Sequence, residues 1–117
     1  MLIMSAVEYY TRSNGRQPVA EWRDGLNSRV KAVIDAKVDH LARYGTELLR
    51  TDMLKTISGS DDFYELRGGQ CRIALCCDRP RDTFVLLHGF LKKKRVESGE
   101  IEQARRLLHE YLSAKRG

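Results

Sequence analysis

The sequence has no long hydrophobic run, and this absence limits where the protein can work. No stretch approaches the ~18 to 20 consecutive apolar residues that a transmembrane helix requires. The opening residues, MLIMSAVEYY, are too few and lack the basic start of a signal peptide. We therefore expect a cytoplasmic protein with no membrane segment.

Cysteine is scarce, and its spacing is not that of a metal site. The three cysteines, an odd number, all fall in one apolar region, at Cys71, Cys76 and Cys77. A zinc site would need paired spacing and a later pair of Cys or His, which the sequence lacks. We expect the thiols to act as small buried hydrophobic groups, and we expect no metal and no cofactor.

Motifs for several other chemistries are missing as well. The glycines of RSNGR and RGGQ do not have the spacing of a phosphate-binding loop or a dinucleotide fold. There is no Gly-x-Ser-x-Gly motif, so catalysis through a Ser or Cys nucleophile is unsupported. The 117 residues contain no repeat and no Pro/Ser-rich linker, and we expect one domain, 1–117.

What the chain does contain is a surplus of positive charge and apolar residues at helical spacing. Its net charge of +5 favours an anionic partner, either nucleic acid or an acidic protein. One amphipathic helix is predicted from Asn27 or Ser28, either of which can cap it, to Gly45, which can take the left-handed conformation. A second amphipathic helix begins at about Ser98, and a short helix over about 18–25 starts with a proline.

Three apolar or alternating runs lie between the helices. They are FYELR, CRIALCC and TFVLLHGFL, separated by the turn segments GGQ and DRPRD. Strands with such short connections form an antiparallel meander. With a further strand at about 5–11, the order strand, helix, helix, meander, helix predicts an α+β fold. We expect the two N-terminal helices and the C-terminal helix to pack against one face of a small sheet.

Charged side chains gather in the first hairpin of this meander. Glu65 and Arg67 alternate with Tyr64 and Leu66, and Arg72 follows the turn, where it can project beside Arg67. Two like charges on adjacent strands are costly unless an anion lies between them. That anion can be a nearby carboxylate in a solvated network, or a phosphate, which a planar guanidinium binds through two oxygens. The pattern leaves both interpretations open.

The last run of the meander ends in adjacent cations, which are Lys92, Lys93, Lys94 and Arg95. Eight Lys or Arg and four Glu lie from residue 90 onward, so four of the five net positive charges fall there. Such a run is usually a solvated loop. Its position, where a buried strand leaves the sheet near Arg67 and Arg72, favours an anion-binding surface. Within the same strand, His88 alternates with Leu86 and Phe90; a hydrogen-bonded packing role is the common one, although imidazole also transfers protons near neutral pH.

Four phrases taken together resemble a known family in order and spacing. They are VAEWRDGL, LKTISGSDDFYELR, CRIAL and FVLLHGFLKKKRVESGEIEQARRLL, and they cover about 19–108. They are similar to the phage-derived, HigB-like branch of the RelE/ParE toxin superfamily. The resemblance implies a compact α+β toxin that cleaves mRNA, usually on the translating ribosome. It also implies a cognate antitoxin, commonly a helix-turn-helix protein.

The resemblance extends to single residues. Arg67 matches the family's arginine after Glu-Leu, Arg72 the arginine that opens the next strand, and Lys92 and Lys93 the basic pair. It implies an endoribonuclease that needs no metal, because the RNA 2′-hydroxyl attacks the adjacent phosphate. On this basis Arg72 and Lys93 stabilise the extra negative charge that develops on the attacked phosphate. Arg67 supports either that phosphate or Glu65.

The remaining roles stay open at this stage. Glu65 or His88 is the base, Tyr64 stacks on a nucleotide or assists the leaving group, and Lys94 and Arg95 join Lys92 in binding RNA. Two departures from the family pattern concern Cys71, which stands where an aromatic residue is common, and the segment after the lysines, which lacks the usual Thr/Gln and Pro. The alternatives are a ParE-like toxin that inhibits gyrase, which the YELR and HGFLKKK phrases disfavour, and a non-catalytic antitoxin-binding or nucleic-acid-binding module.

Overall fold

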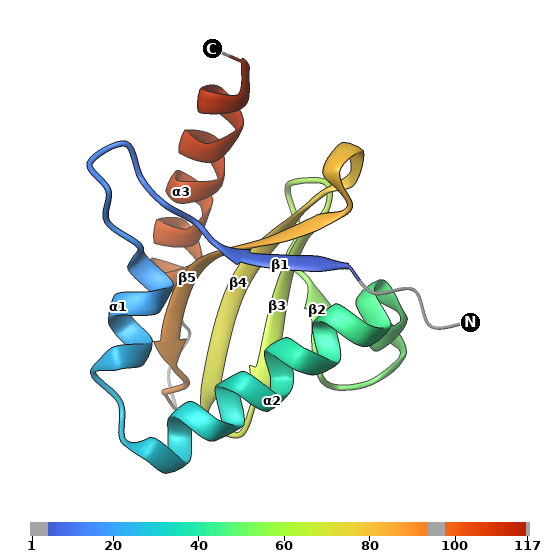
Figure 1. Cartoon of the computed structure of the whole chain (residues 1–117). Helices are drawn as coiled ribbons and strands as arrows, with labels where there is room; N and C mark the ends of the chain where they lie inside the picture. The colour runs from blue at the N-terminus through green and yellow to red at the C-terminus, as the bar shows by residue number, and fades with distance from the viewer. Residues whose placement is uncertain (1–4, 94–97, 117) are drawn as a thin grey trace.

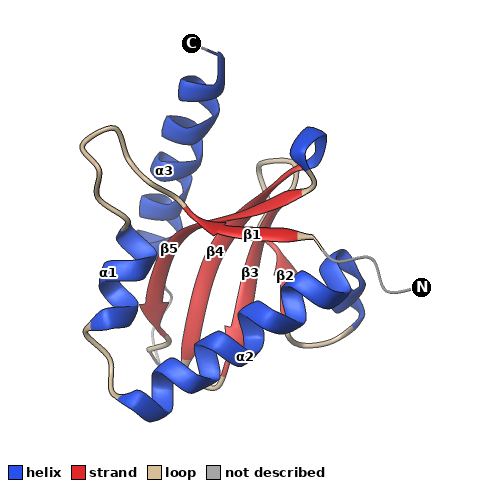
Figure 2. Cartoon of the chain, in the orientation of Figure 1, coloured by secondary structure: helices blue, strands red, loops and turns tan. Residues whose placement is uncertain are grey.

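The computed structural model describes residues 5–93 and 98–116, which form a five-stranded sheet flanked by helices (Figure 1, Figure 2). Along the chain the elements are β1 (Ala6–Tyr9), α1 (Pro18–Asp24), α2 (Ser28–Tyr44), the 3-10 helix η1 (Gly45–Arg50), β2 (Leu54–Thr56), β3 (Phe63–Gly68), β4 (Cys71–Asp78), the 3-10 helix η2 (Arg79–Arg81), β5 (Thr83–Leu91) and α3 (Ser98–Arg116). The α+β class and the order predicted from the sequence are confirmed.

The ends of α2 follow from local hydrogen bonding. Asn27 is the N-cap, because its side-chain oxygen accepts a 3.0 Å hydrogen bond from the Val30 amide. Gly45 follows the last turn, and its N–H donates to the Leu41 carbonyl. Its φ of +55° requires glycine-like freedom, but its ψ of −137° differs from the left-handed helical conformation predicted for it.

The sheet is mixed, which the sequence did not predict. Its strand order is β1-β5-β4-β3-β2, and β3, β4 and β5 form the predicted antiparallel meander. However, β1 pairs with β5 in parallel, and β2 adds an antiparallel edge strand beside β3. The three residues of β2 are too few to show an alternating pattern, so this strand was missed.

Helices cover both faces of the sheet, so the prediction that all of them pack on one face is wrong. Figure 1 shows α1 and α2 on one side and α3 on the other. Buried residues of α1 and α2, such as Ile34, pack with Leu75 and Leu86. Buried residues of α3, such as Leu108, pack with Cys76 and Val85. The central strands are apolar on both sides, and such strands must be covered on both.

A register shift in β5 decides where His88 points. Ala74 pairs with His88 and Leu75 pairs with Leu86, which leaves Leu87 as an extra residue opposite no partner. Leu86 therefore faces α1 and α2, whereas Leu87 and His88 both lie on the α3 face. In a regular strand His88 would share a face with Leu86, two residues earlier, but the bulge places His88 on the opposite side of the sheet.

Candidate functional site

The α3 face of the sheet brings four of the predicted residues together. We call Glu65, Arg67, Arg72 and His88 the basic site; they lie on β3, β4 and β5. Arg67 lies directly opposite Arg72 in the β3–β4 pairing, as the hairpin sequence predicted. Arg72 in turn lies opposite Phe90, two residues beyond His88. Because residues two apart on a strand share a face, the arginines, the carboxylate and the imidazole all point to one side.

Glu65 neutralises part of the positive charge at this site. One of its carboxylate oxygens, Oε1, accepts a 2.8 Å hydrogen bond from Arg67 Nε and lies 3.8 Å from Arg72 Nε. The Glu65 residue is only 9% exposed and Arg72 only 8%, so this charge interaction is weakly screened by solvent. Asp62, another acid near this hairpin, instead binds Arg79 and accepts a hydrogen bond from the Tyr64 hydroxyl. Two guanidinium groups thus share one carboxylate, and the cluster keeps a positive balance.

The Arg72 guanidinium is held in one orientation by the β3–β4 turn. Its Nη1 donates hydrogen bonds of 2.8 Å to the Gly69 carbonyl and 2.9 Å to the Cys71 carbonyl. A charged donor fixed in this way needs no rearrangement to bind an anion, which is the property of a preorganised oxyanion or phosphate site. Arg67 is different, because its side chain is 40% exposed and can follow a ligand.

His88 pairs with an acid that sequence reasoning did not assign to the site. Its Nε2 lies 3.2 Å from Oε1 of Glu100, in the first turn of α3. Its ring also stacks on Phe90, with centroids 5.8 Å apart. The imidazole side chain is 18% exposed and Glu100 38%, so solvent or a ligand can reach the pair. The only sequence signal for Glu100 was its place in the phrase EIEQA, since the pairing depends on how α3 lies over the sheet.

Tyr64 is not part of the site. It lies on the opposite face of β3, in the core beneath α1 and α2, and is only 6% exposed. Its hydroxyl donates a 3.1 Å hydrogen bond to Asp62, and burial, followed by this contact, raises the pKa of Tyr64. The predicted stacking of Tyr64 on an RNA base is therefore wrong, because the ring is enclosed on the side away from the arginines.

The lysine run begins beside the basic site. The Lys92 amide donates a 2.7 Å hydrogen bond to the Gln70 carbonyl, which fixes the start of the run against the β3–β4 turn. The side chains of Lys92 and Lys93 are exposed. Lys94 and Arg95 lie outside the described residues. A further cation from α3, Arg105, lies 5.5 Å from the Phe63 ring centre and donates to the Ser58 carbonyl.

The three cysteines lie in β4 and differ in their burial. Cys71 and Cys76 are buried, as predicted, while Cys77 is partly exposed. Burial, the largest cause, raises the pKa of the Cys76 thiol to about 12. Within residues 5–93 and 98–116, no three His, Cys, Asp or Glu side chains are grouped to hold a metal ion. No helix in those ranges is long and apolar enough to cross a membrane.

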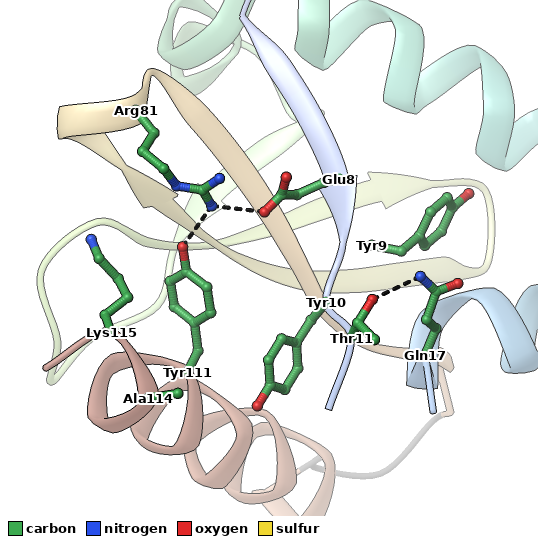
Figure 3. Close-up of a pocket in the computed structure, with 9 residues that line it drawn as sticks. All are labelled: Glu8, Tyr9, Tyr10, Thr11, Gln17, Arg81, Tyr111, Ala114 and Lys115. Atoms are coloured by element: carbon green, nitrogen blue, oxygen red, sulfur yellow. Dashed lines mark hydrogen bonds and ion pairs between the residues drawn. The ribbon is translucent and has the colours of Figure 1, made fainter. Parts of the chain in front are cut away.

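A separate open cavity of about 760 Å³ lies between β1 and α3 (Figure 3). Its lining consists of Glu8, Tyr9, Tyr10, Thr11, Gln17, Arg81, Tyr111, Ala114 and Lys115. Arg81 donates to Glu8 at 2.7 Å and to the Tyr111 hydroxyl at 2.8 Å. The charges around this cavity are therefore satisfied by one another.

Asp78 is the centre of that charge network. Its side chain has no exposed surface, and it accepts hydrogen bonds from Lys115 at 2.8 Å and from the Tyr111 hydroxyl at 2.6 Å. Arg81 adds a 3.0 Å contact. The Lys115 contact, followed by that of Tyr111, holds the pKa of Asp78 well below its usual range, and burial raises that of Tyr111 to about 12. The network ties the end of α3 to β4, and we regard it as structural.

Solved structures define the class to which this fold belongs. The structure matches RelE in the archaeal RelE–RelB complex from Pyrococcus horikoshii, with a TM-score of 0.62 and 15% identity over 79% of this chain and 99% of the other. It also matches the isolated RelE toxin of E. coli, with a TM-score of 0.55 and 18% identity over 88% of this chain and 98% of the other. The protein thus has the fold of the RelE superfamily.

The sequence identifies the particular family within that class. Residues 21–109 match the family described as "Phage derived protein Gp49-like". The chain therefore belongs to the phage-derived Gp49-like family, in agreement with the resemblance seen in the sequence. A comparison with curated proteins gives no match.

Proposed function

We infer that the protein is the toxin of a type II toxin–antitoxin system and that it acts in the cytoplasm as an endoribonuclease on mRNA. The observation that carries this proposal is the basic site. A fixed, buried Arg72 and a partly exposed His88–Glu100 pair lie on one face of a RelE-type sheet. Family membership supports the toxin class, and the matched structures include the isolated RelE toxin of E. coli and RelE in a RelE–RelB complex.

The reaction requires only groups that this site offers. The RNA 2′-oxygen attacks the adjacent phosphorus and loses its proton to a base. The bond to the 5′-oxygen then breaks, and that oxygen takes up a proton, leaving a 2′,3′-cyclic phosphate and a 5′-hydroxyl. Arg72 stabilises the extra negative charge on the phosphorane. Lys93 and Arg67 add positive charge beside the phosphorane. Lys92, Lys94 and Arg95 bind the RNA backbone that flanks the cleaved bond.

His88 is a better base than Glu65 in this arrangement. Glu65 is buried and binds Arg67, with Arg72 close by, so proton uptake would disrupt both contacts. His88 is reachable from solvent, and Glu100 lies beside Nε2, where it can orient the ring and stabilise the imidazolium. We therefore assign proton transfer to His88 and the positioning of the arginines to Glu65.

Expression of the protein without its antitoxin is expected to arrest growth and translation, with mRNAs cut to fragments that carry 2′,3′-cyclic phosphate ends. Primer extension and end-group analysis of RNA from the arrested cells measure this directly. Purified 70S ribosomes, added or omitted in vitro, show whether cleavage needs the ribosome. Growth arrest with intact mRNA and inhibited DNA supercoiling would contradict the proposal in favour of a gyrase inhibitor. Salt-sensitive RNA binding without cleavage would show instead that the protein is a non-catalytic RNA-binding module.

The His88→Gln variant tests the base. It is expected to lower the cleavage rate about 100-fold, because the glutamine amide cannot accept the 2′-hydroxyl proton. Single-turnover cleavage of a defined mRNA is the measurement. His109→Gln is the matched control, since His109 is an exposed residue of α3. An unchanged cleavage rate in the His88 variant would transfer the role of base to Glu65.

The proposed partner is a cognate antitoxin, of the helix-turn-helix kind that the family resemblance implies. The RelE of Pyrococcus horikoshii was crystallised with RelB, which supports a protein partner for this chain. Acidic residues on such a partner would be attracted to the exposed Lys92 and Lys93 and to the partly exposed Arg67.

A further inference from the structure

A second polar cavity lies next to the basic site and extends around the end of the sheet. Its volume is about 470 Å³. Its lining consists of Lys37, Thr51, Asp52, Met53, Arg67, Gly68, Gly69 and Arg72. Arg67 and Arg72 belong to the α3 face, whereas Lys37 belongs to α2, on the opposite face. Figure 1 shows α2 crossing the sheet near the turn between β3 and β4. The cavity thus joins cations from both sides of the sheet.

Gly68 allows Lys37 to reach this position. A methyl group placed on Gly68 would lie 2.7 Å from Cγ of Lys37, 3.5 Å from its Cε and 3.2 Å from Cγ1 of Val33. Any side chain at position 68 would therefore displace the lysine. The stem of Lys37 lies across the glycine, and Lys37 lines the cavity beside the β3–β4 turn, in the manner of a lysine whose apolar stem is covered.

The charges in this cavity are not balanced. Arg67 is paired with Glu65, and Asp52 is paired with Lys55 at 3.3 Å. In the part of the chain that the structure describes, the ammonium group of Lys37 makes no hydrogen bond or ion pair. A half-buried lysine without a partner, beside two arginines, raises the positive potential at the turn. The chemistry of this cavity fits an anion with several oxygens.

We propose that this cavity is a phosphate-binding subsite for single-stranded RNA, with Lys37 as an RNA-binding residue. The strand runs from the basic site past Arg72 and Arg67 and around the β3–β4 turn to Lys37. The subsite rests on the proposed function, because the phosphate it takes belongs to the backbone flanking the cleaved bond. It extends the RNA contact surface to α2, whose buried residues Ile34 and Leu41 serve the hydrophobic core.

The test measures binding of a single-stranded RNA oligonucleotide, 2′-O-methylated so that it cannot be cleaved, by fluorescence anisotropy over a range of salt concentrations. Lys37→Met keeps the stem over Gly68 and removes the charge. It is expected to weaken binding about five- to tenfold at low salt and to reduce the slope of log affinity against log salt by about 0.7, the value for one phosphate contact on a single strand. Lys37→Arg is expected to keep both the affinity and the slope.

Lys31→Met is the matched control, because Lys31 lies on the same helix but does not line the cavity. Equal effects of the Lys37 and Lys31 changes would mean that only net charge matters, which overturns the subsite. Cleavage of unmodified mRNA by Arg72→Ala separates the two proposals. If Arg72→Ala is inactive while Lys37→Met binds RNA as Lys31→Met does, only the subsite is wrong. If the unaltered protein neither cleaves nor binds RNA, the proposed function fails and the subsite fails with it.

Discussion

The Arg72→Ala variant is expected to lose mRNA cleavage by about 1,000-fold, because it removes a preorganised positive charge at the phosphate. The guanidinium is buried and fixed by two turn carbonyls, so solvent cannot replace it in the same position. Single-turnover cleavage of a defined mRNA measures the loss. In cells, the same variant is expected to relieve growth arrest.

A control is needed because Arg72 also holds the β3–β4 turn. Arg43→Ala removes an exposed arginine of α2 that pairs only with Asp39 among the described residues, and it is expected to cleave at the normal rate. Arg72→Lys retains the charge but not the two-pronged geometry, and an intermediate rate is expected. If Arg72→Ala melts at the normal temperature and still cleaves RNA normally, phosphate stabilisation lies elsewhere.

The largest expected loss of stability comes from Asp78→Asn. Breaking a buried ion pair by altering one partner typically costs about 3 to 5 kcal/mol. A value of about 3 kcal/mol is expected here, because Lys115 and Arg81 are partly exposed and can be solvated when their acceptor loses its charge. Urea unfolding monitored by circular dichroism measures the difference. The end of α3 is expected to show the greatest increase in hydrogen exchange.

The same residue predicts how stability depends on pH. The pKa of Asp78 in the folded protein lies well below its usual value because of Lys115 first and Tyr111 second. As pH falls, the unfolded chain therefore takes up the proton first. The stabilisation is complete above about pH 4 and is lost progressively below it. Asp78→Asn is expected to reduce the fall in the free energy of unfolding at acidic pH, whereas Asp39→Asn, on the exposed surface of α2, is expected to leave that fall unchanged. A fall of normal size in the Asp78 variant would assign the effect to other carboxylates.

Local sequence determined the parts of this protein that depend on neighbours along the chain. Apolar spacing and the Asn27 cap located α2, since helix formation is governed by side chains within a few residues. Two turn segments fixed the meander, and the tight turn at Gly69 placed Arg67 opposite Arg72. Strand alternation also separated Tyr64 from Glu65, although Tyr64 was still assigned to RNA binding.

Only the tertiary structure decided how distant segments complete the site. The bulge at Leu87 turns His88 toward α3, and no feature of an apolar run shows such an insertion in advance. The contact between Glu100 and His88 depends on the packing of α3 over the sheet, and the position of Lys37 depends on α2 crossing Gly68. The sequence by itself determined the helices, the hairpin and its paired arginines, because these are set by local spacing. Packing across the sheet determined the positions of His88, Glu100 and Lys37 relative to the arginines, because these contacts join residues that lie far apart in the chain.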